Sequence, residues 1–208
     1  TKSKDVLYKI DNKNIIGPSD DKLLNIDELS IPGEHNLQNF LAASTCSHLM
    51  GISQNQIVKS MKEFKGVEHR LEYVRTINET DYINDSKATN IDSVIVAINT
   101  YKQPIVLILG GFNKGANFRL LLPHIKSSHV RDIVSYGDAG GHINTALGDA
   151  VRSVQVTDLS SAVKKAQLMA APGDIVLLSP GCASYDEFSN FEERGNHFKS
   201  IIKNLAAS

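Results

Sequence analysis

The chain has 208 residues, of which 41% are hydrophobic, so it is long enough for one large globular domain or two small ones. Its 22 Lys and Arg residues are balanced by 23 Asp and Glu residues, and the net charge is -1. Because the basic residues are scattered, the sequence lacks the basic stripe of a nucleic-acid-binding surface. The longest aliphatic run, residues 105–109, is far too short to span a bilayer. The composition therefore excludes the nucleic-acid-binding and membrane-inserted classes.

The N-terminus and the cysteines indicate where the protein works. Residues 1–5 lack the apolar core of a signal peptide. Cys46 and Cys182 are far apart in apolar or small-residue surroundings, so we expect two buried free thiols, with a disulfide as the unsupported alternative. We therefore expect a cytoplasmic protein, and a monomer. Since Thr1 is not a natural start, we also expect the chain to be a fragment or a processed product.

The first third of the chain predicts short strands followed by two helices. The strands lie at 6–8 and 15–16, punctuated by Gly17-Pro18 and Pro32-Gly33. Residues 1–34 have too little apolar content for a core of their own and are typical of the edge of a larger sheet. A helix opens near Gly33, and Ser53 can cap a second one. The residues expected to face inward are Leu37, Phe40, Leu41 and Leu49 in the first helix, and Ile57, Met61 and Phe64 in the second.

From residue 71 onward, strands alternate with helices. The predicted strands are 71–77, 82–84, 105–109, 133–136, 151–156 and 175–178, and the predicted helices are 90–102, 117–128, 139–147, 158–170 and about 189–206. Continuous apolar strands that alternate with helices are typical of a mostly parallel sheet covered on both faces. The sequence therefore predicts an α/β fold, Rossmann-like, preceded by a separate N-terminal segment.

Three of the predicted strands end in polar loops, here named the first loop (residues 84–90), the second loop (110–117) and the third loop (179–186). In a parallel sheet these loops lie at the same edge, so they can converge on one ligand. Lys87 and Lys114, with hydroxyls and free backbone N–H groups at helix starts, indicate an anion site for carboxylate or phosphate. An ordinary capped strand-to-helix turn explains the first loop equally well.

Other chemistries are less well supported. Gly110-Gly111 with Lys114 fits neither common phosphate-loop pattern, so a carboxylate clamp at Lys114 is favoured over a phosphate cradle. Asp85 with Lys87 is better explained as a binding pair than as an acid–base pair, because no nucleophile with its base is recognisable. Cys182 has no neighbouring His or acid that would make it a nucleophile. Four histidines lack metal-ligand spacing, and we expect surface or packing roles for them: His124, His129, His142 and His197.

Taken together, these motifs resemble the Mur ligase family, and within it the UDP-N-acetylmuramoyl-L-alanine:D-glutamate ligases of peptidoglycan synthesis. The resemblance rests on D-S-K-A-T-N at 85–90, on Gly110-Gly111 with Lys114-Gly115, and on 179–188 with 190–192 and 194–195. Residues 33–36 with Asn39 match the family's HN-x-x-N element, and residues 69–72 match its HR-hydrophobic-E element. The match runs in order over nearly the whole chain, and the first loop is the part that separates the glutamate-adding ligases from their sisters.

The resemblance implies a three-domain enzyme of which this chain is one part. Residues 1–67 would be the C-terminal part of the central ATPase domain, and 68–208 the C-terminal Rossmann-like domain. The N-terminal UDP-binding domain, the P-loop and the Mg²⁺ ligands would lie outside the chain. In the family, ATP phosphorylates the carboxylate of UDP-N-acetylmuramoyl-L-alanine, and the amine of D-glutamate attacks the acyl phosphate to form an amide. ATP, Mg²⁺, both substrates and the missing domains are thus the implied cofactors and partners, and the fragment alone would be inactive.

The resemblance also implies roles for single residues, but no catalytic or metal-binding one. The implied nucleotide contacts are Asn36, Asn39, Arg70 and Asp85, and the implied D-glutamate contacts are Lys87, Thr89, Lys114, Ser184, Tyr185 and Phe191. The chain departs from the family at Phe112, Asn113, Asn117 and Gly181, and the first three put an acidic contact from the second loop in doubt. Two alternatives stay open: a stand-alone Rossmann-like module that binds an anionic amino acid or nucleotide, and another Mur or folylpolyglutamate-type ligase.

Overall fold

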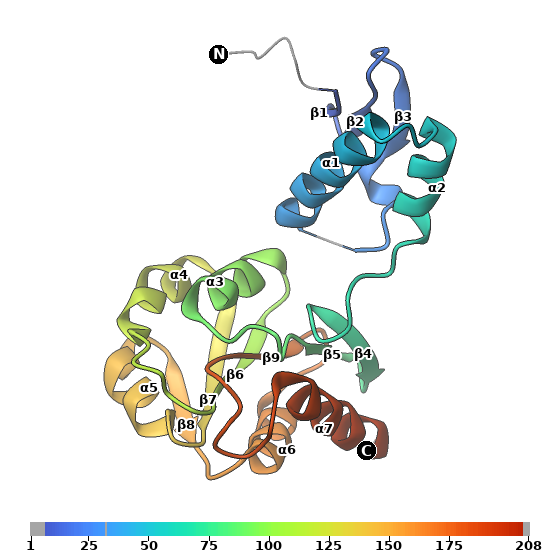
Figure 1. The fold of residues 1–208 in the computed structure, drawn as a ribbon. Helices are drawn as coiled ribbons and strands as arrows, with labels where there is room; N and C mark the ends of the chain where they lie inside the picture. The colour runs from blue at the N-terminus through green and yellow to red at the C-terminus, as the bar shows by residue number, and fades with distance from the viewer. Residues whose placement is uncertain (1–6, 32, 206–208) are drawn as a thin grey trace. The chain divides into compact units, whose positions relative to one another are not determined.

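The computed structural model describes residues 7–31 and 33–205, and it divides the chain after Gly66 into two compact units (Figure 1). The N-terminal unit ends at Gly66, and the C-terminal unit begins at Val67. Each unit has a hydrophobic core of its own. The assignment of these units to parts of a larger enzyme stays a prediction.

The N-terminal unit is a small antiparallel sheet with two helices. Its elements are β1 (Lys9–Asp11), β2 (Asn14–Ile16), β3 (Lys22–Asn25), the 3-10 turn η1 (Ile26–Glu28), α1 (Glu34–Leu49) and α2 (Gln54–Glu63). Ser53 stands at the N-cap of α2, as predicted, in a reciprocal pair with Gln56. Buried side chains from the sheet and both helices form one core, which consists of Tyr8, Ile15, Leu24, Phe40, Ile57 and Met61.

Four predictions for this unit are wrong. Phe64, expected to face inward in the second helix, is the C-cap residue of α2 and is 42% exposed. Leu7 and Tyr8 precede β1 instead of forming a strand, and Val6 lies outside the described residues. Leu49 is 73% exposed instead of inward-facing. Cys46 is an exposed thiol, whereas Cys182 is buried, and both are free. The core of this unit takes Phe40 as its buried apolar residue from α1, and Leu49 and Cys46, toward the end of the same helix, lie outside that core.

The C-terminal unit is built on a six-stranded sheet in which the last strand of the chain lies near the middle (Figure 1). The strands are β4 (Glu72–Ile77), β5 (Thr80–Asn84), β6 (Ile105–Gly110), β7 (Val130–Tyr136), β8 (Arg152–Gln155) and β9 (Ile175–Gly181), in the order β4-β5-β9-β6-β7-β8. All neighbours pair in parallel except β4 and β5, which are antiparallel. The mostly parallel sheet predicted from the sequence is confirmed.

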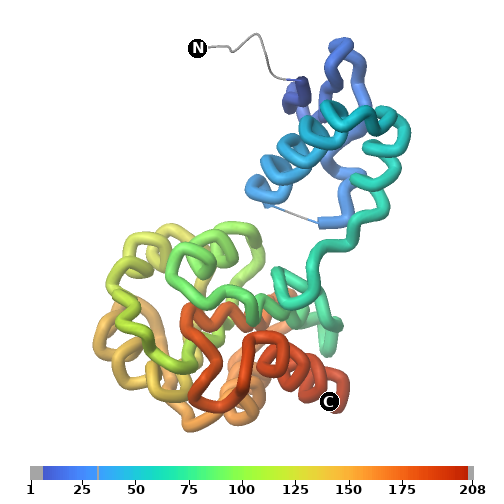
Figure 2. The backbone as a smooth tube through the Cα atoms, in the orientation of Figure 1, coloured from blue at the N-terminus to red at the C-terminus, as the bar shows by residue number. Residues whose placement is uncertain are grey.

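Helices cover both faces of this sheet, which explains its continuous aliphatic strands. The sheet has a hydrophobic core on each face, and the residues of β6 alternate between the two. Ile105, Leu107 and Leu109 face the first core, whereas Val106 and Ile108 face the second, and all five are fully buried. The first face carries α3 (Ile91–Thr100), η2 (Phe118–Leu121), α4 (Leu122–Ser127) and α5 (Gly140–Leu147) with the turn η3 (Gly148–Ala150). The opposite face carries α6 (Leu159–Met169) and α7 (Phe191–Asn204) (Figure 2).

Helix starts differ from the predicted ranges because capping residues stand outside the helix. The side chains of Asn90, Asp158 and Asn190 each accept a backbone N–H of the first turn, so α3, α6 and α7 begin one residue after them. The predicted helix at 117–128 is divided, since Asn117 caps the short turn η2 and Pro123 lies at the start of α4.

The connections after β5 and β9 leave the sheet toward opposite faces. The chain passes from β5 to α3 on one face and from β9 to α7 on the other, although the two strands are parallel neighbours. Such a topological switch point, at the carboxyl ends of the strands, is where open α/β sheets bind ligands. No helix in the described part of the chain combines the length and hydropathy that crossing a bilayer requires.

Candidate functional site

The three polar loops meet at the carboxyl edge of the sheet. The Gly181 N–H at the end of β9 donates to the Ala88 carbonyl of the first loop, 2.8 Å away. The Phe112 N–H of the second loop donates to the Ala183 carbonyl of the third loop, at 2.9 Å. The third loop is therefore bonded to both of the others, and the predicted convergence is confirmed.

A buried arginine fastens this junction. Arg194, in the first turn of α7, is fully buried, and its Nη1 donates to the carbonyls of Cys182 (3.1 Å) and Ala183 (3.0 Å). Its Nε donates to the Ser86 hydroxyl (3.0 Å) and its Nη2 to the Ser86 carbonyl (2.8 Å). The Ser86 hydroxyl in turn donates to the Phe191 carbonyl (2.7 Å). One guanidinium thus joins the first loop, the third loop and α7.

The second loop approaches the same guanidinium closely. Gly111 has φ +121, and a Cβ there would lie 2.4 Å from the Ala183 carbonyl and 3.0 Å from Nη1 of Arg194. Because both the space and the backbone conformation exclude a side chain, glycine is required at this position. The sequence analysis gave Arg194 no role. Its position in the apolar stripe of α7, between Phe191 and Phe198, is the signal that could have found it.

Two lysines extend from the junction, each over an aromatic ring. The Lys87 ammonium lies 5.5 Å from the ring centre of Phe191, and the Lys114 ammonium lies 4.9 Å from that of Tyr185. The lysines come from the loops after β5 and β6, the two neighbours of β9, whereas the rings come from the segment after β9. None of the ion pairs among the described residues involves either lysine. Both ammonium groups can therefore receive an anion.

His69, a second residue that the sequence analysis left without a role, supports the first of these pairs. It is buried, and its carbonyl accepts the Lys87 N–H at 3.0 Å. Its ring meets Phe191 edge-on, with 6.1 Å between the ring centres, and its Nδ1 lies 3.0 Å from Nδ2 of Asn84. A Cβ at Gly195 would lie 2.2 Å from that same Nδ1. His69 thus packs between β5 and α7 and contacts both members of the Lys87–Phe191 pair.

Asp85 lies below the surface of the site. Its carboxylate accepts the Ser179 hydroxyl (2.8 Å) and the Leu71 N–H (3.2 Å), and the residue is only 4% exposed. Burial raises the pKa of the Asp85 carboxyl to about 7, although both hydrogen bonds and the nearby charge of Arg70 oppose the shift. A carboxyl that titrates near neutral pH is typical of functional sites. Burial also raises the pKa of the Cys182 thiol to about 12, which makes it a poor nucleophile.

The remaining candidates are spread over both units. Thr89 is exposed on the first loop, and its N–H donates to the Lys87 carbonyl at 2.9 Å. Ser184 is buried in the third loop, where its carbonyl accepts two backbone N–H groups of the turn that follows. Arg70 is exposed near Asp85. The last two candidates, Asn36 and Asn39, belong to α1 of the N-terminal unit. Asn36 is half-buried and Asn39 is exposed.

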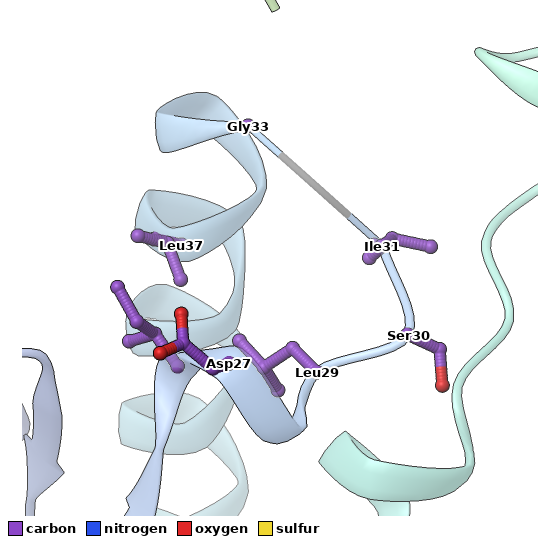
Figure 3. Close-up of a pocket in the computed structure, with 7 residues that line it drawn as sticks. Asp27, Leu29, Ser30, Ile31, Gly33 and Leu37 are labelled. Atoms are coloured by element: carbon purple, nitrogen blue, oxygen red, sulfur yellow. The ribbon is translucent and has the colours of Figure 1, made fainter.

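A pocket in the N-terminal unit contains none of these candidates. Figure 3 shows the residues that line it, beside η1 and the start of α1. The pocket has a volume of about 360 Å³. Its one charged group, Asp27, pairs with Lys13 at 3.6 Å. The lining residues are Ile26, Asp27, Leu29, Ser30, Ile31, Gly33 and Leu37. Aliphatic side chains predominate, and the pocket offers no chemistry that matches the loops.

A mostly parallel sheet covered by helices on both faces, with cationic loops at its switch point, is a Rossmann-like domain with a candidate anion site. Comparison with known families gives a match to the model described as "Mur ligase, glutamate ligase domain" over residues 69–182. This match covers more than half of the chain, and the chain therefore belongs to the Mur ligase family. The resemblance inferred from the loop motifs is confirmed at that level.

Similar proteins agree with this assignment. The chain is 44% identical over 200 residues to a UDP-N-acetylmuramoylalanine–D-glutamate ligase of Clostridioides difficile, with 94% of the chain and 44% of the relative covered. It is 46% identical over 181 residues to the ligase of that name from Pelotomaculum thermopropionicum, with 86% and 40% covered. A pseudomurein peptide ligase type C from Methanothermus fervidus shares the fold, with a TM-score of 0.69, 17% identity, and 95% and 41% covered. The chain thus spans less than half the length of these relatives.

We expect Arg194→Met to destabilise the C-terminal unit by roughly 3 kcal/mol or more, because it leaves several buried acceptors without a donor. Urea unfolding followed by circular dichroism measures this. Arg119→Met, at an exposed arginine of η2, is the matched control and should change the unfolding free energy by less than about 0.5 kcal/mol. An unfolding midpoint of Arg194→Met equal to that of the wild type would contradict the role of this guanidinium.

The raised pKa of Asp85 predicts a pH-dependent stability. Between its ordinary value of 3.8 and about 7, the folded carboxyl keeps a proton that the unfolded one has lost, so the unfolded state binds fewer protons. Stability should therefore fall as pH rises toward 7, by at most about 1.4 kcal/mol per pH unit. Urea unfolding between pH 5 and pH 8 should show this fall for the wild type relative to Asp85→Asn, whose side chain stays neutral. Parallel curves for the two proteins would show that the buried carboxyl does not titrate in this range.

Proposed function

We propose that this chain is the C-terminal part of an ATP-dependent amide ligase that adds D-glutamate to UDP-N-acetylmuramoyl-L-alanine in peptidoglycan precursor synthesis. The observation that carries the proposal is the pair of lysines on either side of the loop after β9, neither of which has a carboxylate partner among the described residues. D-glutamate presents two carboxylates, one for each lysine. The names of the relatives that are 44% and 46% identical support the choice of amino acid.

In this proposal the C-terminal unit binds and orients the amino acid. Lys87 and Lys114 each receive a carboxylate, and each charge-assisted hydrogen bond contributes about 1.5–3 kcal/mol. The other proposed contacts to D-glutamate are Thr89, Ser184, Tyr185 and Phe191. With both carboxylates held, the amine is positioned for attack on the activated carboxyl group of the nucleotide substrate. Proximity and orientation can supply most of the acceleration, so this unit needs no catalytic base of its own.

We propose four residues as nucleotide contacts, two in the N-terminal unit and two in the C-terminal unit. Asn36 and Asn39 lie three residues apart on α1, and Arg70 and Asp85 lie in the C-terminal unit. An exposed guanidinium beside a carboxyl fits the mixed chemistry of a nucleotide, which carries phosphates and sugar hydroxyls. When bound, ATP supplies the phosphoryl group that activates the alanyl carboxylate as an acyl phosphate.

The proposed reaction also uses Mg²⁺, but we propose no residue of this chain as a ligand of the metal ion. Among residues 7–31 and 33–205, no three side chains of His, Cys, Asp or Glu gather in a way that could hold a metal ion. We therefore assign the Mg²⁺ ligands to the part of the relatives that this chain does not span. A cytoplasmic location is also part of the proposal, supported by two free thiols that suit a reducing compartment.

The decisive experiment restores the missing part. A chimera that joins the upstream segment of the C. difficile relative to this chain should release ADP only when D-glutamate and UDP-N-acetylmuramoyl-L-alanine are both present. The 208-residue chain alone should show no turnover. Equal activity with L-glutamate or another amino acid would show that the assigned substrate is wrong, and clear turnover by the chain alone would contradict its role as one part of a larger enzyme.

In the chimera, Lys114→Ala should raise the KM for D-glutamate by roughly 10- to 100-fold, because a charge-assisted bond to a carboxylate is lost. Steady-state kinetics with D-glutamate as the varied substrate measures this. Lys126→Ala, at an exposed lysine of α4, is the control and should leave the KM unchanged. If Lys114→Ala also leaves the KM unchanged, Lys114 does not bind the substrate.

A further inference from the structure

The third loop carries an exposed aromatic residue that needs an explanation. Tyr185 is 62% exposed, although burying an aromatic ring is normally favourable. Its ring faces the Lys114 ammonium, whose nitrogen lies 4.9 Å from the ring centre. A cation at this distance from a tyrosine ring is attracted by the negative charge of the ring face. The exposed ring therefore has a partner, and that partner is a lysine of the candidate site.

A second ring holds Tyr185 in place. Phe112 meets Tyr185 edge-on, with 6.5 Å between ring centres and 62° between ring planes. Phe112 is itself fixed, because its N–H donates to the Ala183 carbonyl two residues before Tyr185. The glycine before it, Gly111, permits this close approach of the two loops. The ring of Tyr185 thus rests on a joint between the second and third loops.

The turn that carries Lys114 is built to present the ammonium group. The side-chain oxygen of Asn113 accepts the N–H groups of Gly115 (2.9 Å) and Ala116 (3.0 Å). Gly115 has φ +85, a conformation that favours glycine. The turn is therefore closed by a neutral amide, which does not pair with the adjacent ammonium as a carboxylate would.

We propose that Tyr185, in addition to the D-glutamate contact assigned to it above, is a positioning residue of this site, whose ring, supported by Phe112, holds the Lys114 ammonium ready for a carboxylate of the acidic substrate. This proposal rests on the D-glutamate function proposed above. The ring occupies one side of the ammonium and leaves its other N–H donors for the ligand. Tyr185 thereby reduces the conformational freedom that Lys114 must lose on binding.

The first measurement uses the 208-residue chain without any ligand. The ring should shift the ε-methylene proton resonances of Lys114 upfield, and the Lys114→Arg variant assigns these resonances. Tyr185→Phe, which keeps the ring, should retain the upfield shift, whereas Tyr185→Leu should lose it. Tyr73→Leu, at a tyrosine of β4 that is 59% exposed, is the control and should leave the Lys114 resonances unchanged. Because Tyr185 is exposed, its variants are expected to fold, which far-ultraviolet circular dichroism checks.

The second measurement uses the chimeric ligase. Tyr185→Leu should raise the KM for D-glutamate about two- to fivefold with little change in kcat, and Tyr185→Phe should restore the wild-type KM. Lys114 resonances that do not move in Tyr185→Leu would overturn the proposal, and so would an unchanged KM for that variant. A chimera that does not use D-glutamate would instead refute the proposed function, while the ligand-free resonances would still decide whether Tyr185 holds Lys114.

Discussion

The candidate site depends on one buried positive charge. A guanidinium in a protein interior is costly unless its N–H groups are hydrogen-bonded. Arg194 meets this requirement with backbone carbonyls and a serine hydroxyl, and forms no ion pair with any described carboxylate. Because its acceptors belong to two different loops, neither loop can move without leaving part of the charge unsatisfied. The base of the site is thereby rigid, while Lys87 and Lys114 extend from it into solvent.

The departures from the family pattern in the second loop have a structural meaning. Asn113 and Asn117 use their side-chain oxygens to accept backbone N–H groups, as an aspartate would. A carboxylate at position 113 would close the same turn but would also attract the neighbouring Lys114. The amide keeps the turn and leaves the lysine unpaired. Phe112, in turn, supplies an aromatic edge to Tyr185 where an acidic residue would supply none.

The sheet could be predicted because its pattern is local. The aliphatic run of β6 and the helical stripe of α3 each indicate their element without knowledge of the partner. Convergence of the three loops followed from parallel strands alone. The role of Arg194 could not be predicted in this way. The apolar pattern of a helix shows which face is buried, but it does not show which carbonyl groups of other loops a buried arginine contacts. His69 was missed for a related reason, since its place depends on Gly195, which lies more than one hundred residues away in the sequence.

The central position of β9 has a consequence for the order in which the site assembles during synthesis. β5 and β6 are made first, but in the finished sheet they do not touch, since β9 lies between them. Until residues 175–181 emerge, each of these strands has an open edge, and the arginine that joins the loops has not yet been made. Pairings of such long sequence separation form slowly and leave unpaired edges exposed to aggregation. The edge that carries the candidate site is therefore the last part of this unit to form, and a chain that ends before β9 would have two hydrophobic strands with unprotected edges.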